Sequence, residues 1–246
     1  MKKQGVLVVL TVFAQLILAC NIYAQSAAPD SVPAKQALAS SRINYTRQIA
    51  FQSRLLNGIK YVEYPAGYTG NAYYQTGEFQ NASLHYDDAD FYNVPILYDL
   101  YKEEVVVKHP ADTSYMSLIN NKLDKFSIGN HTFIRIDADS AQTAYKTGFY
   151  ELLYNGRSQI VKKYEKDIQE EKSGLTIQNV FNEHTGYYLR KDNKYFPISG
   201  KRALLNLLKD RKKDLDTYIK LNKIDFSGNE EQAIVKVASY YDQLTK

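Results

Sequence analysis

Carboxylates crowd two short polar stretches, the first places where this sequence could hold a metal or carry out acid–base chemistry. Asp87, Asp88 and Asp90 lie in "HYDDADFYN", and "RIDADSAQ" contributes Asp137 and Asp139. Hard oxygen ligands at such spacing suit Ca²⁺, although neither stretch has the glycine and distal glutamate of an EF-hand loop. Two of these carboxylates could also serve as the acid and base of a glycosidase if the fold held them at the required separation. A polar turn is the simpler interpretation of both stretches.

Four histidines form a second group of side chains that could bind a metal or move protons. They are His85, His109, His131 and His184, each on or beside a predicted strand and far from the others in sequence. A metal site requires at least two of them to converge, and the sequence leaves their arrangement open. Isolated strand and loop histidines are most often solvated or bonded locally, which is the simpler expectation here.

Motifs for nucleophilic, metal-dependent and phosphate chemistry are missing from the sequence. There is no Gly-x-Ser-x-Gly elbow, no His-Glu-x-x-His pair and no complete phosphate loop. "SGKRALL", from Ser199 to Leu205, places Gly-Lys just before a predicted helix, where backbone N–H groups can hold an anion. It lacks the upstream glycine and the hydroxyl after the lysine, so we interpret it as an ordinary helix start. The sequence therefore assigns no catalytic residue and no cofactor.

Basic residues are concentrated in the C-terminal segment. The formal net charge of the whole chain, +4, is too small to indicate nucleic acid as a partner. Between Lys201 and Lys223, however, there are eight Lys or Arg and only three Asp. Clustered cations of this kind could meet acidic lipid headgroups or an acidic partner, while a solvated helix face is the simpler interpretation. The candidate basic patch consists of Lys209, Arg211, Lys212 and Lys213.

Tyrosine is abundant, with 22 residues, and tryptophan is absent. Tyrosine suits half-buried β surfaces and also serves as an amphipathic contact residue at interfaces. Sugar-binding surfaces usually rely on tryptophan as well, so its absence weighs against one. We expect most of the tyrosines to pack the sheet.

The residues above must be positioned by a β-rich body that extends from about Gly58 to Ile198. Asn57-Gly58 and Asn155-Gly156 are pairs that tolerate positive φ in two-residue hairpin turns, and Asp192-Asn193 predicts a further hairpin. "GFYELLYNGRSQIVKKYEK" therefore predicts a paired antiparallel ribbon. Further candidate strands are "EEVVVKH", "SYMSLI", "HTFIRID" and "GYYLRKDNKYFPI".

One strand shows clear alternation of its side chains. "YNVPILYDLY" has a two-residue period, and Pro95, which lacks an N–H, predicts a strand edge or a bulge. One face carries Tyr92, Val94, Ile96, Tyr98 and Leu100, and the other carries Asn93, Pro95, Leu97 and Asp99. Short strands with close turns predict a meandering antiparallel sheet, a sandwich or a partly closed barrel.

The last fifty residues change to a helical period. Apolar residues from Leu204 to Ile219 fall on one helical face, and the charges within that stretch predict two helices broken near Lys209-Asp210, with Asp210 as the second N-cap. Ser227, three residues before Glu230, predicts a capping box for a third helix. The fold class is therefore α+β, an antiparallel β-rich body followed by two or three C-terminal helices.

The N-terminus is typical of an export signal. Lys2 and Lys3 precede an apolar run from residue 5 to 19 that is short for a membrane span. Cleavage after Ala24 would leave Gln25 as the first residue, whereas a lipoprotein peptidase would cut before Cys20 and leave it lipidated. We favour cleavage after Ala24, because Ile17 and Leu18 are unusual residues in a lipoprotein signal.

Composition predicts four segments in the chain. These are a signal peptide (1–24, or 1–19 if Cys20 is lipidated), a flexible linker (25–41), the β-rich body (42–198) and the C-terminal helices (199–246), packed on the body as one domain. The linker is rich in Ala, Ser and Pro, a composition that buries little surface. The chain after Cys20 contains no cysteine, which excludes disulfides and thiol chemistry there.

Three stretches resemble a family of uncharacterised exported proteins of Gram-negative bacteria. They are "GFYELLYNGRSQIVKKYEK", "YYLRKDNKYFPISGKRALLNLLKDRKKDLDTYI" and "QAIVKVASYYDQL". The resemblance spans roughly Ile59 to Leu244 and implies export and a hairpin-rich body joined to a Lys-rich helical tail. It implies no activity.

The sequence thus favours an exported, non-catalytic binding or structural component of the cell envelope, periplasmic, secreted or lipid-anchored, with an unidentified envelope protein or surface ligand as partner. An envelope hydrolase using carboxylates such as Asp87, Asp90 or Asp137 is one alternative. A carrier of lipid or another small ligand, which needs an apolar cavity between sheet and helices, is the other.

Overall fold

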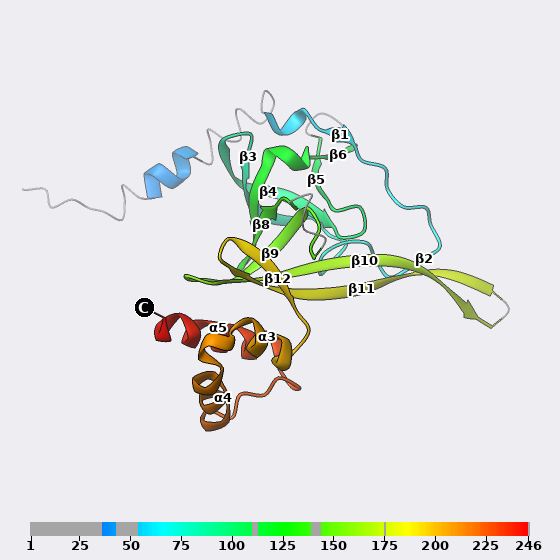
Figure 1. Cartoon of the computed structure of the whole chain (residues 1–246). Helices are drawn as coiled ribbons and strands as arrows, with labels where there is room; N and C mark the ends of the chain where they lie inside the picture. Colours follow the sequence, from blue (N-terminus) through cyan, green and yellow to red (C-terminus); the bar gives the residue numbers. More distant parts are fainter. Residues whose placement is uncertain (1–35, 43–53, 110–112, 139–143, 175, 246) are drawn as a thin grey trace, which may run out of the picture. The chain divides into compact units, whose positions relative to one another are not determined.

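One large, mostly antiparallel sheet contains every strand from Ile59 to Ile198 (Figure 1). The strand order is β1-β6-β5-β4-β3-β7-β8-β9-β10-β11-β12, with β2 paired in parallel to β11. The expected α+β class is confirmed, and the sheet is open, with β1 and β12 as its edges. The strands are β1 Ile59–Lys60, β2 Tyr68–Thr69, β3 Gln80–Tyr86, β4 Ala89–Asp99, β5 Glu104–Lys108, β6 Tyr115–Ser117, β7 Leu123–Ile128, β8 His131–Ile136, β9 Gly148–Asn155, β10 Gln159–Ser173, β11 Thr176–Lys191 and β12 Lys194–Ile198.

The computed structural model describes residues 36–42, 54–109, 113–138, 144–174 and 176–245. Contacts divide the chain into Met1–Tyr45 and Thr46–Lys246, so the β-rich body and the C-terminal helices belong to the same unit. In the first unit, residues 36–42, most of them within the expected linker, form an exposed helix. The predicted signal peptide, with Cys20, Ala24 and Gln25, lies outside the described residues.

The sheet curls around a core of large aromatic and aliphatic side chains. The rings of Tyr98 in β4 and Phe149 in β9 have centroids 6.0 Å apart, although β3, β7 and β8 lie between these strands in the sheet. Phe126 and Phe133 stack between them at 4.8 Å. Because buried aromatic rings of this size fill the space between the strands, the body needs no disulfide to hold its curvature.

β10 and β11 form a long ribbon that leaves the body (Figure 1). Their residues pair from Gln159↔Arg190 to Ser173↔Thr176, whereas β9 pairs only with the first four residues of β10. The sequence pattern predicts the part of the ribbon next to the body but not its outer half, in which charged side chains replace a regular apolar alternation.

Two of the three predicted hairpin turns differ from expectation. Asp192 and Asn193 have φ of 52° and 62° and join β11 to β12 as a two-residue turn, as predicted. The loop after Asn155 has three residues instead of two, because Asn155 pairs with Gln159. Asn57-Gly58 joins no hairpin: it follows the short η2 (Arg54–Leu56), and β1 pairs with β6 far along the chain.

A bulge in β4 corrects the predicted alternation of that strand. Asn93 has φ of 54°, and the register with β3 shifts there. Phe91 is consequently buried and Tyr92 is 37% exposed, so Tyr92 does not share the buried face of Ile96. Beyond the bulge the residues of both faces, from Ile96 to Leu100, are buried.

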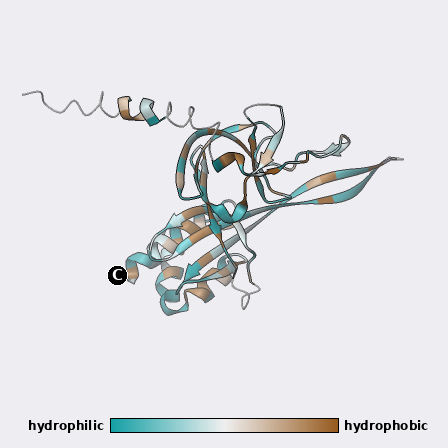
Figure 2. Ribbon diagram, turned by 90° about the horizontal axis from the view of Figure 1, so that it is seen from above, coloured by the Kyte–Doolittle hydropathy of each residue, from teal (hydrophilic) through white to brown (hydrophobic). Residues whose placement is uncertain are grey.

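Three α-helices follow the sheet and pack on the part of it that β9, β10 and β12 form; Figure 2 shows hydrophilic and hydrophobic segments mixed along them. They are α3 (Lys201–Leu207), α4 (Lys212–Leu221) and α5 (Glu230–Leu244), with η4 (Lys209–Arg211) between the first two. Their apolar sides pack with Ile160 and Leu189 of the ribbon in a second core. Among the described residues, no helix combines the length and apolar character that crossing a bilayer requires.

The helix break near Lys209-Asp210 is confirmed, but both predicted N-caps are wrong. Arg211 occupies the N-cap position of α4. The Asp210 carboxylate instead accepts hydrogen bonds from Lys191 Nζ and Tyr241 Oη, each at 3.0 Å. Asn229, not Ser227, caps α5 by accepting a hydrogen bond from the Gln232 N–H. The contacts of Asp210 and Asn229 that decide both caps are not visible in the spacing of residues along the sequence.

Candidate functional site

A buried carboxylate organises the surface where the ribbon leaves the body. Asp99, at the end of β4, is fully buried. Its Oδ2 accepts hydrogen bonds from the hydroxyls of Tyr61 at 2.7 Å and Tyr64 at 2.8 Å. Its Oδ1 accepts from the backbone N–H groups of Tyr101 and Lys102, both at 2.9 Å. Four donors therefore compensate the loss of water around this carboxylate.

The two hydroxyls that contact Asp99 serve as donors rather than as acids. Burial raises the pKa of both Tyr61 and Tyr64 well above the usual tyrosine value, and their side-chain hydrogen bonds raise it further. Tyr61 Oη also lies 3.2 Å from Tyr73 Oη, and burial raises the pKa of Tyr73 as well. These phenols stay protonated at neutral pH, so they hold the segment around Tyr61 against the end of β4.

Four aromatic rings gather on the outside of this anchor. Phe181 of β11 packs edge-on to Tyr64 at a centroid distance of 5.1 Å and stacks on Tyr68 at 5.3 Å. Tyr101, in the turn between β4 and β5, lies 6.0 Å from Tyr64 and 6.1 Å from Phe181. We call this cluster the tyrosine platform; its members are Tyr64, Tyr68, Tyr101 and Phe181.

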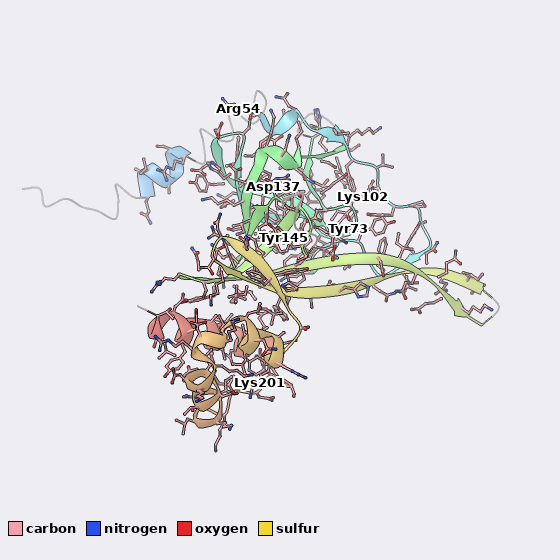
Figure 3. All side chains as sticks on the ribbon, viewed as in Figure 1. Arg54, Tyr73, Lys102, Asp137, Tyr145 and Lys201 are labelled. Carbon is pink, nitrogen blue, oxygen red and sulfur yellow. The ribbon has the colours of Figure 1, made fainter. Side chains whose placement is uncertain are left out.

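The tyrosine platform is held in place but not covered by the described part of the chain. Tyr101 is 45% exposed and the neighbouring Val62 is 68% exposed, while the other three rings are half-buried. The Lys102 ammonium lies 4.4 Å from the ring centre of Tyr61 and 4.5 Å from that of Tyr64, and it donates to the Val62 carbonyl. Figure 3 marks Lys102 at this place above the ribbon.

Three segments far apart in sequence build the tyrosine platform. The first is the chain from β1 to β2, which runs beside the outer half of the ribbon because Tyr68 pairs with Asn179. Gly70, with φ of 80°, then turns this chain away, a conformation that favours glycine. The other two are the turn after β4 and the middle of β11. No motif in the sequence signals this convergence, so the platform could not be predicted from it.

The carboxylates proposed for calcium occupy a tight turn. Asp87 and Asp88 have φ of 51° and 60° between the paired residues Tyr86 and Ala89. Asp87 forms ion pairs with Arg54 at 3.6 Å and Lys122 at 3.3 Å. The structure brings neither Asp87 nor Asp88 into a metal site, since the described residues include no group of three or more His, Cys, Asp or Glu that could hold a metal ion.

The other candidate acids and bases are dispersed in separate local pairs. Asp90 contacts His85 at 2.8 Å, and Asp137 accepts from Arg135 at 2.6 Å; Asp139 lies outside the described residues. His85 also lies 3.5 Å from Asp124, and His131 pairs with Glu151 and His184 with Asp167. His109 donates its backbone N–H to Ser114. No two of the four histidines are brought together in a metal-binding group among the described residues.

The candidate basic patch is exposed around η4 and the first turn of α4. Its four cations line a hollow of about 630 Å³ together with Asp210, Asp214 and Asp216. The acidic side chains within the same hollow offset much of the positive charge, which weakens the case for an anion-binding surface there.

Known protein families, curated proteins and solved structures offer no match to this chain, so the assignment of a function rests on the geometry above.

Proposed function

We propose that this protein is an exported, non-catalytic binding component of the bacterial cell envelope, and that the tyrosine platform holds an envelope protein. One observation carries the proposal: four aromatic rings from three segments pack together, and Tyr64 among them is bonded to a buried carboxylate, while Tyr101 and Val62 stay exposed. Scattered exposed apolar residues are ordinary, whereas a contiguous, anchored aromatic patch is typical of an interaction surface.

Rigidity favours binding through this surface. Tyrosine has few rotatable bonds, so it contributes contact area at a low entropy cost. The hydroxyl of Tyr64 is bound to Asp99, and its ring lies under the Lys102 ammonium. Little conformational freedom of the Tyr64 side chain remains to be lost when a partner binds. Less of the interaction free energy is therefore offset by the entropy cost of ordering the surface.

The mutual inclination of the rings in the tyrosine platform favours a protein as the partner over a glycan. The planes of Tyr64 and Phe181 are inclined by 80°, and those of Tyr101 and Phe181 by 75°. Only Tyr68 and Phe181 approach a stacked arrangement, at 28°. Inclined rings leave gaps that side chains can enter, whereas a sugar ring stacks best on a flat aromatic face.

The two alternatives have less support. A hydrolase needs two carboxylates facing each other across a cleft, and Asp87, Asp90 and Asp137 each contact their own cation or histidine. A carrier needs an apolar cavity between sheet and helices. At that place Ile160 and Leu204 have no exposed surface, because they lie in a filled core.

Photo-crosslinking in native envelopes tests the proposed contact. A benzoylphenylalanine replacing Tyr101 in the full chain is expected to give one dominant protein adduct. The same replacement at Tyr92, which is similarly exposed at 37% but far along β4, is the matched control. No adduct at Tyr101, or the same adduct at both positions, would overturn the platform as the contact surface. Binding to a glycan array that is lost in Tyr101→Ala would replace the protein partner by a glycan.

The export part of the proposal has its own measurement. The intact mass of the protein isolated from envelopes is expected to correspond to a chain that starts at Gln25. An acylated chain starting at Cys20 would keep the envelope location and add a membrane anchor. A cytoplasmic chain that retains Met1 would refute export.

A further inference from the structure

A polar hollow lies on the sheet face opposite the helices, away from the tyrosine platform. Ile160 of β10 and Leu189 of β11 turn toward the helical core, so their neighbours along each strand turn to the other face. There Gln159 of β10 pairs with Arg190 of β11, and Arg190 pairs with Tyr195 of β12. Directly opposed residues in antiparallel strands share a face, so these three side chains stand in a row.

This row forms one wall of a hollow of about 670 Å³, which we call the basin. Its other lining residues include Tyr145 and the end of β8 with Asp137, both marked in Figure 3. Small-molecule sites commonly have volumes of about 300–1,000 Å³. The basin is therefore large enough for a small organic ligand.

Aromatic and amide groups in the basin are fixed in position. Tyr145 is 9% exposed, and its ring centre lies 5.4 Å from that of Tyr195. Tyr195 Oη donates to Gln159 Oε1 at 3.2 Å, and Gln159 Nε2 donates to Asn155 Oδ1 at 2.8 Å. A ligand would meet a half-buried ring, that of Tyr195, beside hydrogen-bonding groups whose orientation is already set.

Among the described residues, one guanidinium of the basin has no carboxylate partner. Arg135 donates to Asp137 at 2.6 Å. Arg190 and Lys194 form no ion pair with any residue that the structure describes, and Arg190 contacts the side-chain oxygen of Asn193 instead. With Asp192 included, the lining carries three cations and two carboxylates. A planar guanidinium in this state matches the two oxygens of a ligand carboxylate.

We propose that the basin binds an acidic sugar, that is, a sugar ring carrying a carboxylate. Arg190 takes the carboxylate, and the Tyr195 ring, in place of the tryptophan that this chain lacks, contacts the apolar face of the sugar. Gln159 and Asp137 bond its hydroxyls. The platform and the basin use different residues, so each assignment can fail without the other.

Calorimetric titration of the full chain with a panel of small probes tests this assignment. Glucuronate or galacturonate is expected to bind saturably, with glucose and acetate at least about tenfold weaker, because each supplies only part of the contacts. Absence of saturable binding to both uronates overturns the proposal. Acetate or inorganic phosphate binding as tightly as the uronates would reduce the basin to a simple anion site and also overturn it.

Variants distinguish the basin from other basic surfaces. Arg190→Gln is expected to weaken uronate binding at least about tenfold, since a charge-assisted pair is lost. Arg190→Lys keeps the charge without the planar fork and should fall between that variant and the wild type. Arg211→Gln, the matched control in the candidate basic patch, should bind as the wild type does. Binding by Arg190→Gln equal to that of the wild type, or an equal loss in Arg211→Gln, contradicts the proposal. A wild-type melting temperature of Arg190→Gln excludes misfolding as the cause of its loss.

Discussion

Glu103, in the turn between β4 and β5, forms an ion pair with Lys163 of β10, although β3, β7, β8 and β9 separate these strands in the sheet. The Glu103 carboxylate also accepts the Phe149 N–H at 2.7 Å, and Lys163 Nζ contacts the Phe149 carbonyl at 3.2 Å. The side chain of Glu103 is 25% exposed and that of Lys163 is 3% exposed. The pair thus bridges the gap that strand hydrogen bonds leave open in the curled sheet.

Glu103→Ala is expected to destabilise the protein by about 3–5 kcal/mol in urea unfolding at neutral pH, because it leaves the Lys163 ammonium buried and unpaired. Burial already lowers the pKa of Lys163, and Glu103 acts against that shift. The double variant Glu103→Leu, Lys163→Met should recover most of the loss. Lys201→Ala, at the half-exposed pair with Asp216, serves as control and should cost no more than about 1 kcal/mol. Equal effects of the two single variants would contradict the bridging role.

Asp99→Ala is expected to lower the free energy of unfolding by about 3 kcal/mol, since two hydroxyls and two backbone N–H groups lose their acceptor. It should also loosen the tyrosine platform and weaken crosslinking from Tyr101. Asp90→Ala removes an exposed carboxylate whose contact is His85, and it should change stability by less than about 1 kcal/mol. If Asp99→Ala leaves crosslinking from Tyr101 unchanged, the carboxylate does not organise the surface.

Stability is expected to fall as the pH rises above about 10, where tyrosine in the unfolded chain begins to ionise. Burial raises the pKa of Tyr74 to about 12 and that of Tyr98 and Tyr164 further. The folded state then binds more protons than the unfolded state, so each such tyrosine contributes a loss of about 1.4 kcal/mol per pH unit until its folded pKa is reached. The lowered pKa of Lys163 changes stability with pH in the opposite direction. It is a single group, however, whereas several tyrosines have a raised pKa.

Tyrosinate absorbance measured against pH checks this prediction. Part of the tyrosine signal should appear only together with the loss of circular dichroism at alkaline pH. If all 22 tyrosines ionised near their ordinary pKa with the fold intact, the buried hydrogen-bonded phenols would be ruled out.

Asn229→Ala is expected to cost about 1 kcal/mol in urea unfolding, because the Asn229 side chain accepts the Gln232 N–H at 3.0 Å and caps α5. Ser227→Ala, at the cap position that the sequence pattern favoured, should change stability by less than about 0.5 kcal/mol. The reverse order of effects would restore Ser227 as the N-cap.

The sequence by itself determined the α+β class, the β9–β10 and β11–β12 hairpins and the helix break near Lys209. These features depend on local signals, namely side-chain period and turn residues such as Asp192-Asn193, which act within a few residues. Local reasoning failed where one residue changes the register, as the bulge at Asn93 moves Tyr92 to the exposed side. It also failed at the helix caps, where neighbouring polar residues compete for the same N–H groups.

Only the tertiary structure decided the two candidate sites. Asp99 meets Tyr61 and Tyr64 because the segment between β1 and β2 reaches the end of β4, and no spacing in the sequence records a contact across 38 or 35 residues. Arg190 and Gln159 likewise share a face only because of the register of β10 against β11. Register depends on the packing of both sheet faces and on every turn between the strands. The chemistry of a site assembled across strands is therefore fixed by the fold as a whole.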